Sequence, residues 1–245
     1  MDGNFNYKKL LKTERVTYQE TTLNLGEFEK SISKFVELTL LFQQSIGEIE
    51  SPQNELHTFA IFNYAQLPYT VNTICKQIMT GYYLESKILI RHLFETLLQL
   101  KYFTKFPDKL LPHINGKRLL ISQMAENIFS DKLAYKEYYD FLCKYAHGFS
   151  MKGVECYNPV TKAFTVGKTY NHTNCKLSVY LLSDLIFGFI NNFDYIYPTN
   201  TIESTESGRE LKSYVKGWCL SSRDEHIKAS GGFLLMHNAI DELIL

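Results

Sequence analysis

The stretch Glu27–Ile49, EFEKSISKFVELTLLFQQSIGEI, decides the fold class because its apolar residues recur at steps of three and four. That spacing places them on one side of an α-helix and therefore predicts a helix with a single apolar stripe. Asn24, three residues before Glu27, resembles the first half of a capping pair, so we expect the helix to begin near Glu27. The stripe consists of Phe28, Ile32, Phe35, Leu38, Phe42, Ile46 and Ile49.

The same periodicity continues along the chain. Ser51-Pro52 is typical of a helix start and predicts a second helix, with a kink at Pro68. Gly81 and Pro107 bracket a third helix over residues 82–106. Further helices are predicted over residues 117–129, from Ser130 or Asp131 to 146, from 173 or 174 to 193, around 210–218 and after Gly231-Gly232.

One region departs from this helical pattern. Residues 154–157 and 163–166, on either side of Asn158-Pro159, have the composition of a short hairpin. We therefore predict an all-α helical bundle with a short β-hairpin excursion near 153–170. Residues 198–209, which begin with Pro198 and are rich in Thr, Ser and Glu, form the most linker-like stretch. We expect a single helical domain over 1–245, with helices of 205–245 packing on it; a true linker would instead divide the chain into two domains.

Composition excludes several classes of function. Lys plus Arg and Asp plus Glu both number 26, so no overall charge attracts the protein to nucleic acid or a membrane. The five cysteines contain no Cys-x-x-Cys pair, which favours a reducing compartment over a secreted disulfide framework. The N-terminus lacks the apolar run of a signal peptide, and residues 177–193 have the pattern of a core helix. We expect a cytoplasmic protein without a membrane segment.

The third predicted helix carries an unusual charged pair. Arg91 and Glu95, one turn apart, project from nearly the same line as Leu84, Ile88 and Leu98. Desolvating an ion costs on the order of several kcal/mol, so each charge in such a stripe requires hydrogen-bond partners. The pair is therefore either a structural ion pair at the edge of the core or part of a functional site.

A second candidate lies at the end of a later helix. His147 follows an aromatic-rich segment and directly precedes Gly148. The dipole at a helix C-terminus favours the imidazolium, so this histidine is suited to act as a general acid or base. The alternative is a capping role, in which the imidazole donates to the last carbonyl groups of the helix.

These two segments support a resemblance to a known family. The segments are Lys87-Ile-Leu-Ile-Arg-His-Leu-Phe-Glu-Thr96 and Tyr138-Tyr-Asp-Phe-Leu-Cys-Lys-Tyr-Ala-His-Gly148. Together they resemble an uncharacterised bacterial helical family that pairs an Arg-x-x-x-Glu helix with a later aromatic helix ending in His. That family is similar to the HEPN superfamily, whose helical bundles often dimerise and often cleave RNA without a metal. The resemblance covers residues 55–195.

The resemblance implies a function and a site. It implies an RNA endonuclease of toxin–antitoxin or phage-defence systems, with Arg91, Glu95 and His147 as catalytic residues meeting across helices. Tyr145 and Tyr102 would bind substrate by stacking on bases. A homodimer, RNA or a nucleotide as ligand, an antitoxin or defence protein as partner, and no cofactor are the further expectations. The alternative function is a dimeric, non-catalytic protein-interaction module.

A zinc site is a further alternative. Cysteine and histidine are the preferred ligands of Zn²⁺, and His172-x-x-Cys175 has a usable spacing. No Cys-x-x-Cys pair anchors such a site, so we expect no bound metal. The residues concerned are Cys143, His147, Cys156, His172 and Cys175.

Overall fold

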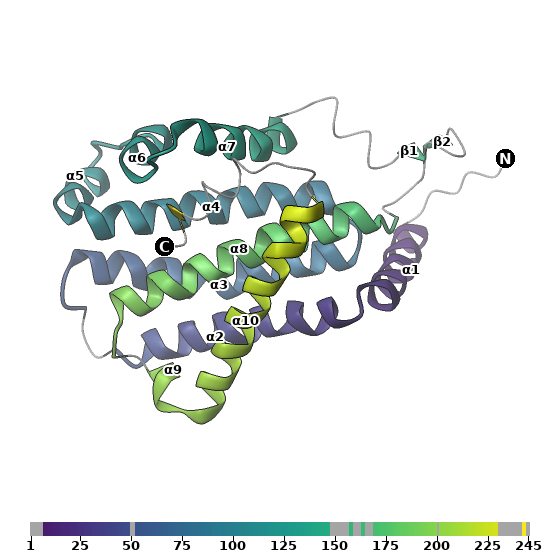
Figure 1. The fold of residues 1–245 in the computed structure, drawn as a ribbon, viewed down its shortest axis with the longest axis horizontal. Coiled ribbons are helices and arrows are strands. Elements are labelled where there is room, and N and C mark those ends of the chain that lie inside the picture. Colours follow the sequence, from purple (N-terminus) through teal and green to yellow (C-terminus); the bar gives the residue numbers. More distant parts are fainter. Residues whose placement is uncertain are drawn as a thin grey trace.

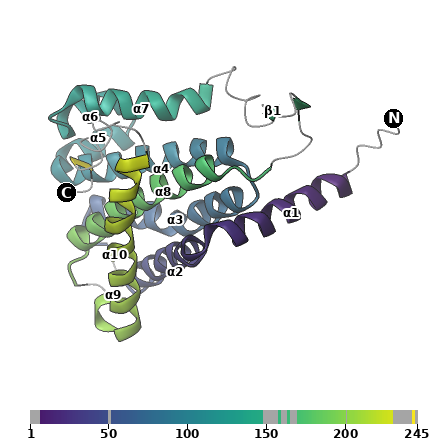
Figure 2. The same ribbon diagram turned by 45° about the vertical axis from the view of Figure 1, so that its right-hand side comes forward.

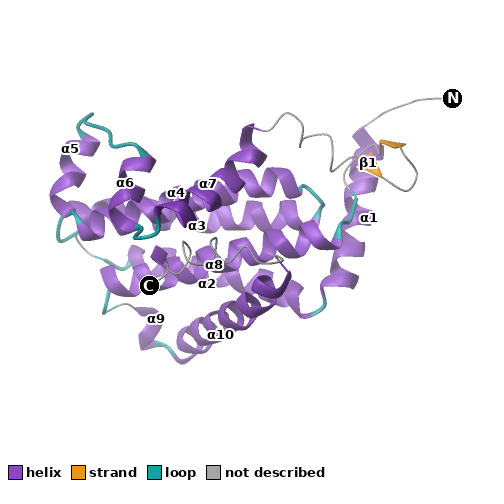
Figure 3. Ribbon diagram, turned by 45° about the horizontal axis from the view of Figure 1, so that its top comes forward, coloured by secondary structure: helices purple, strands orange, loops and turns teal. Residues whose placement is uncertain are grey.

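The computed structural model describes residues 7–49, 52–147, 157–158, 163–164, 169–199, 201–229 and 242–243. These residues form an all-α helical bundle (Figures 1 and 3). The long helices are α1 (Tyr7–Leu25), α2 (Glu27–Gly47), α3 (Glu55–Met79), α4 (Tyr83–Lys105), α7 (Lys132–His147), α8 (His172–Ile196) and α10 (Glu206–Ala229). The shorter elements are η1 (Pro107–Lys109), α5 (Leu110–Ile114), α6 (Ile121–Ile128), β1 (Tyr157–Asn158), β2 (Ala163–Phe164) and α9 (Thr201–Ser204).

Two helices organise the bundle. Helix α4 packs against α3, α6, α7 and α8, and α8 packs in addition against α2 and α10. Figure 1 shows α10 lying obliquely across α8 and α2. An aromatic group at the centre joins three helices, because the Phe42 ring stacks on Phe193 at 4.5 Å and meets Tyr64 edge-on at 5.6 Å. All three side chains are fully buried. The apolar stripe predicted over 27–49 is thus the core-facing side of α2.

The start of α2 differs from the prediction. A separate helix, α1, precedes it and extends away from the bundle (Figure 2). The Asn24 side chain donates to the carbonyl of Glu20 within α1, and the residue that precedes α2 is Gly26, at a φ of 55°. The prediction that Asn24 and Glu27 cap the start of this helix was therefore wrong. Sequence periodicity missed α1 because its buried positions include two threonines, Thr17 and Thr21, which do not form an apolar stripe.

Helix α3 also begins later than predicted. It starts at Glu55, where the Asn54 side chain accepts a hydrogen bond of 2.9 Å from the backbone N–H of His57. Pro52 lies before the helix rather than in its first turn. Asparagine satisfies an N–H group at the helix end, so a side-chain cap at Asn54 outweighs the Ser51-Pro52 signal.

The predicted hairpin is present where the structure describes it. Tyr157 pairs with Phe164 and Asn158 with Ala163 in an antiparallel ladder. The remaining residues of the expected hairpin lie outside the described ranges.

The linker-like stretch 198–209 contains α9 and the start of α10, and α9 packs against both α10 and α2. Lys212 of α10 is paired at 2.5 Å with Asp194 of α8 and also with Glu203 of α9.

Helix α8 is long and apolar enough to cross a membrane, by length and composition alone. Most of its apolar window is buried inside the bundle, as expected for a core helix. The helix predicted after Gly231-Gly232 lies outside the described residues, except for Glu242 and Leu243.

Candidate functional site

Arg91 and Glu95 form an ion pair on α4. The Arg91 Nε donates to Glu95 Oε1 at 3.0 Å, and the two side chains are 20% and 22% exposed. The pair therefore lies at the edge of the core, reachable by solvent but largely desolvated. This is the i,i+4 geometry that neighbouring residues on one helix face allow.

A third residue, Tyr139 of α7, joins this pair. An Arg91 terminal nitrogen donates to the Tyr139 hydroxyl at 2.9 Å, and that hydroxyl donates to Glu95 Oε1 at 2.7 Å. The guanidinium carbon also lies 5.1 Å from the Tyr139 ring centroid, within cation–π range. We call Arg91, Glu95 and Tyr139 the Arg91 cluster. It holds the guanidinium in one orientation between α4 and α7.

The contacts of the Arg91 cluster shift the pKa values of Arg91 and Tyr139. Burial alone would lower the pKa of Arg91, but the hydrogen bond with Tyr139 and the charge of Glu95 raise it overall. Burial, and then the hydrogen bond to Glu95, raise the pKa of Tyr139 to about 12. The arginine is therefore a permanent cation, and the tyrosine is a neutral hydrogen-bond donor near neutral pH.

Lys87 and Cys143 lie one turn from the Arg91 cluster, on α4 and α7 respectively. Lys87, four residues before Arg91, is fully buried, and its Nζ donates to Asn174 of α8 at 3.0 Å. Cys143 follows Tyr139 by four residues on α7, and its pKa is raised by burial against a lowering effect of Arg91. Basic side chains from two successive turns of α4 thus lie where α4 faces α7 and α8.

The first turn of α7 is fixed by two carboxylates. Asp131 Oδ1 accepts from the backbone N–H groups of Leu133 and Ala134, both at 3.0 Å, which confirms one of the two predicted caps. The Glu242 side chain accepts from the Ser130 hydroxyl at 2.7 Å, the Asp131 N–H at 3.2 Å and the Ser130 N–H. Glu242 therefore helps to position the helix that carries Tyr139.

Replacing Glu242 with glutamine is expected to make stability less dependent on pH in the acid range. Burial raises the pKa of Glu242, but the hydrogen bonds from Ser130 and Asp131 outweigh it and lower the pKa below its ordinary 4.5. A lowered folded-state pKa contributes stability that is present above the unfolded value and is lost as pH falls through the folded value. The wild type should lead the variant by about 1 kcal/mol at neutral pH and lose this advantage below 4.5.

Urea denaturation at several pH values measures this difference. Glu126→Gln, at an exposed position on α6, is the control and should stay within about 0.5 kcal/mol of the wild type throughout. A gap between wild type and Glu242→Gln that persists unchanged in acid would contradict the capping role.

The structure describes the other predicted site residues only in part. His147 is the last residue of α7, eight residues or roughly 12 Å along the helix beyond Tyr139, and the side chains of His147 and Tyr145 lie outside the described residues. Tyr102 is 5% exposed and packs on Phe103 and Phe106, eleven residues beyond Arg91 on α4. Eleven residues correspond to roughly 16 Å along a helix, so Tyr102 does not join the Arg91 cluster.

Metal ligands do not gather in the part of the chain that the structure describes. No three His, Cys, Asp or Glu side chains there are arranged to hold a metal ion. The Cys175 thiol is buried, and His172 Nδ1 lies 2.7 Å from the Tyr170 hydroxyl. Cys156 falls outside the described ranges.

Sequence reasoning missed Tyr139 and Lys87. A signal for Lys87 was present, because positions 87, 91 and 95 are spaced four apart and share a face of the third helix. Tyr139 is one of several tyrosines in its segment, and only the packing of α7 on α4 selects it.

Comparison with protein-family models, with curated proteins and with solved structures finds no match for this chain.

Proposed function

We propose that the protein binds RNA or a nucleotide where α4 faces α7, and that it cleaves RNA without a metal. The observation that carries the proposal is the Arg91 cluster: a partly exposed guanidinium held in place by Glu95 and Tyr139 from two helices. Arginine is well suited to phosphate because its planar N–H groups match the geometry of phosphate oxygens. A guanidinium that is already held in one orientation requires little reorganisation to bind a phosphate group.

The proposed reaction uses His147 as the general base. The 2′-hydroxyl of the ribose loses its proton to the imidazole, and the 2′-oxygen forms a bond to phosphorus. The bond from phosphorus to the 5′-oxygen breaks, and a proton from water completes the departing 5′-hydroxyl. The products are a 2′,3′-cyclic phosphate and a 5′-hydroxyl end. Arg91 stabilises the negative charge on the phosphorane, and Glu95 and Tyr139 are positioning residues.

Two substitutions separate binding from cleavage. Arg91→Lys should weaken binding of labelled single-stranded RNA by roughly tenfold, because lysine cannot bind phosphate in a bidentate manner. His147→Ala should bind RNA like the wild type and cleave it roughly 10²–10⁴-fold more slowly. Fluorescence anisotropy measures binding, and gel analysis of RNA products in excess EDTA measures metal-independent cleavage.

Arg15→Ala is the matched control, because it removes an exposed positive charge from α1. It should leave binding and cleavage unchanged, and thermal melts should show that every variant is folded. Cleavage retained in His147→Ala, or loss of cleavage in EDTA, would contradict the proposed mechanism. If Arg91→Lys leaves RNA binding unchanged, the Arg91 cluster is not the RNA-binding site.

A second candidate function is supported by a different observation. Phe62 and Tyr69 of α3 are 69% and 61% exposed and lie seven residues apart, two turns along one helix face. Exposed aromatic side chains on one face are common in protein-interaction surfaces. If the wild type neither binds nor cleaves RNA, the non-catalytic interaction module becomes the better proposal.

A further inference from the structure

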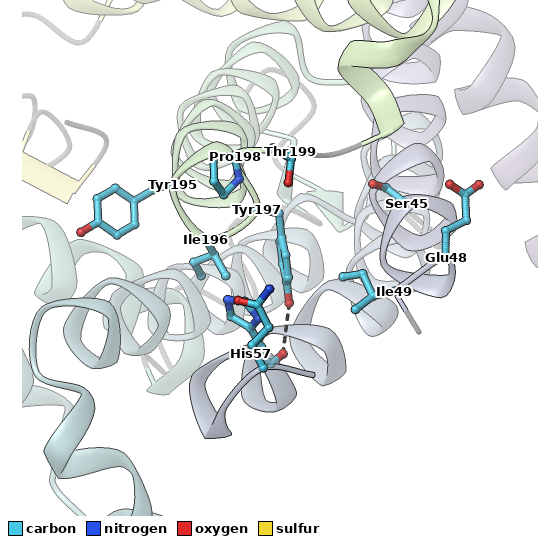
Figure 4. A pocket seen from close by; sticks show the side chains of 10 residues that line it. Ser45, Glu48, Ile49, His57, Tyr195, Ile196, Tyr197, Pro198 and Thr199 are labelled. Carbon is cyan, nitrogen blue, oxygen red and sulfur yellow. Dashed lines mark hydrogen bonds between the residues drawn. The ribbon is translucent and has the colours of Figure 1, made fainter. Parts of the chain in front are cut away.

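A pocket of about 410 Å³ lies at the end of the bundle, where the C-terminal ends of α2 and α8 meet the start of α3 (Figure 4). The Tyr197 ring in its wall packs on His57 and Phe193, and the Tyr197 hydroxyl donates to the His57 carbonyl at 3.0 Å. These groups therefore serve the packing of the helix ends. The features that point to a partner lie elsewhere, in residues 109–120.

Residues 109–120 expose aliphatic side chains at an outer corner of the bundle, and we call them the α5 corner. They comprise the end of η1, the whole of α5 and the loop that leads to α6, which Figure 3 shows at the edge of the molecule. Leu111, Ile114 and Leu120 are each at least 50% exposed. Single exposed apolar side chains are ordinary, but a group of them rimmed by polar residues is typical of a contact surface.

The α5 corner is held to the bundle from its inner side. Leu110 is buried, and the His113 ring packs on Phe103 of α4 at 5.1 Å. Burial, and then the charge of Arg118, lower the pKa of His113, so the imidazole is neutral near neutral pH. Its Nδ1 accepts a hydrogen bond of 3.0 Å from the backbone N–H of Leu119. This bond brings the loop back to α5, so the exposed side chains of both belong to one corner.

Leu120 is fixed at the start of α6. It occupies the position before the first helical residue, where serine, threonine, asparagine or aspartate is usual. Its backbone N–H donates to Gln123 Oε1 at 2.9 Å, and the neighbouring Ile121 packs against the core. The exposed leucine side chain adds nothing to this helix end, and an apolar surface outside the protein is the contact that it suits.

The charges around these aliphatic side chains are positive. The α5 corner contains Lys109, Lys117 and Arg118 and neither aspartate nor glutamate. Asp108, which directly precedes the corner, pairs with Lys109 at 2.9 Å. Lys117 and Arg118, both exposed, therefore carry the excess charge. Because the chain as a whole has no net charge, the attraction of an anionic partner is confined to this corner.

The composition of the α5 corner favours an anionic lipid surface over RNA or a second copy of the chain. Surfaces that bind single-stranded RNA stack bases on aromatic rings, and residues 107–120 contain no Phe, Tyr or Trp. A second copy placed symmetrically on this corner would bring like charges together. A bilayer matches both features, because its hydrocarbon takes up aliphatic side chains and its anionic headgroups attract lysine and arginine.

We propose that the α5 corner docks the protein on an anionic membrane surface. Leu111, Ile114 and Leu120 enter the boundary between headgroups and acyl chains. Lys117 and Arg118 contact the phosphate and carboxylate groups of the lipids. The protein binds at the periphery of the bilayer, and α8 stays in the core of the bundle. Few apolar side chains are inserted, so the binding is reversible.

Cosedimentation of the full chain with vesicles tests the proposal. The wild type should bind vesicles of equal amounts of phosphatidylserine and phosphatidylcholine, and binding should weaken as salt is added. It should bind phosphatidylcholine alone at least roughly tenfold more weakly. Replacing Lys117 and Arg118 together with glutamine should weaken binding to the mixed vesicles by roughly tenfold or more. Leu120→Ser should weaken it roughly tenfold even in high salt, because burial in hydrocarbon does not depend on charge.

The controls remove the same side chains from exposed positions on α1. Leu23→Ser, and Lys8→Gln combined with Lys9→Gln, should bind vesicles like the wild type. Thermal melts should show that every variant is folded.

Four results would each overturn the inference: no vesicle binding by the wild type, equal binding to phosphatidylcholine alone, unchanged affinity in either corner variant, or equal weakening in the α1 controls. If the wild type ignores vesicles and the substitutions at Lys117 and Arg118 weaken RNA binding instead, the α5 corner is a nucleic-acid contact. Vesicle binding does not require Arg91, so the failure of this inference leaves the proposed RNA site untouched.

Discussion

Glu95→Ala is expected to lower the free energy of unfolding by about 1–3 kcal/mol. The carboxylate accepts hydrogen bonds from both Arg91 and Tyr139, so its removal leaves a largely desolvated guanidinium without its counter-charge. A fully buried pair would lose roughly 3–5 kcal/mol, but about a fifth of each side chain is exposed here, which reduces the effect. Urea denaturation followed by circular dichroism measures the change.

Glu37→Ala provides the matched control. Glu37 pairs with Lys34 at 2.5 Å on α2, but both side chains are more than 40% exposed, so the loss should be below about 0.5 kcal/mol. A double-mutant cycle of Glu95→Ala with Tyr139→Phe should give a coupling energy of roughly 0.5–3 kcal/mol. Additive effects of the two substitutions would mean that Tyr139 does not act together with the ion pair.

Phe42→Ala should have the largest effect on stability, about 3–5 kcal/mol. The Phe42 ring is fully buried and contacts Phe193 of α8 and Tyr64 of α3, so its loss leaves a cavity between three helices. The variant should show a lower urea midpoint with an unchanged dependence on urea concentration.

Phe62→Ala is the control for this change, because the same residue type is removed from an exposed position on α3. Its loss should stay within about 0.5 kcal/mol. Comparable losses in the two variants would mean that the α2 stripe does not form the centre of the core.

The fold class and several helices could be predicted from local pattern. The stripe from Phe28 to Ile46 faces the core because four-residue and three-residue steps align on one side of a helix. Asp131 was recognised as a cap because its carboxylate can accept the free N–H groups of its own helix. The pairing of Arg91 with Glu95 follows from their spacing of one turn. Each of these features depends on residues close together in the chain.

The remaining features depend on contacts between distant segments, and only the tertiary structure decided them. Helix α1 buries threonines, so no apolar stripe in the sequence predicted it. The Asn24 side chain bonds within α1 and does not cap α2. Tyr139 joins Arg91 from 48 residues away, and Glu242 caps α7 from more than 100 residues away. The pocket near Tyr197 exists because three helix ends converge. By itself the sequence determined most of the long helices and the local ion pair, because those interactions repeat with the helical period. Which helix faces meet is set by packing across the whole chain.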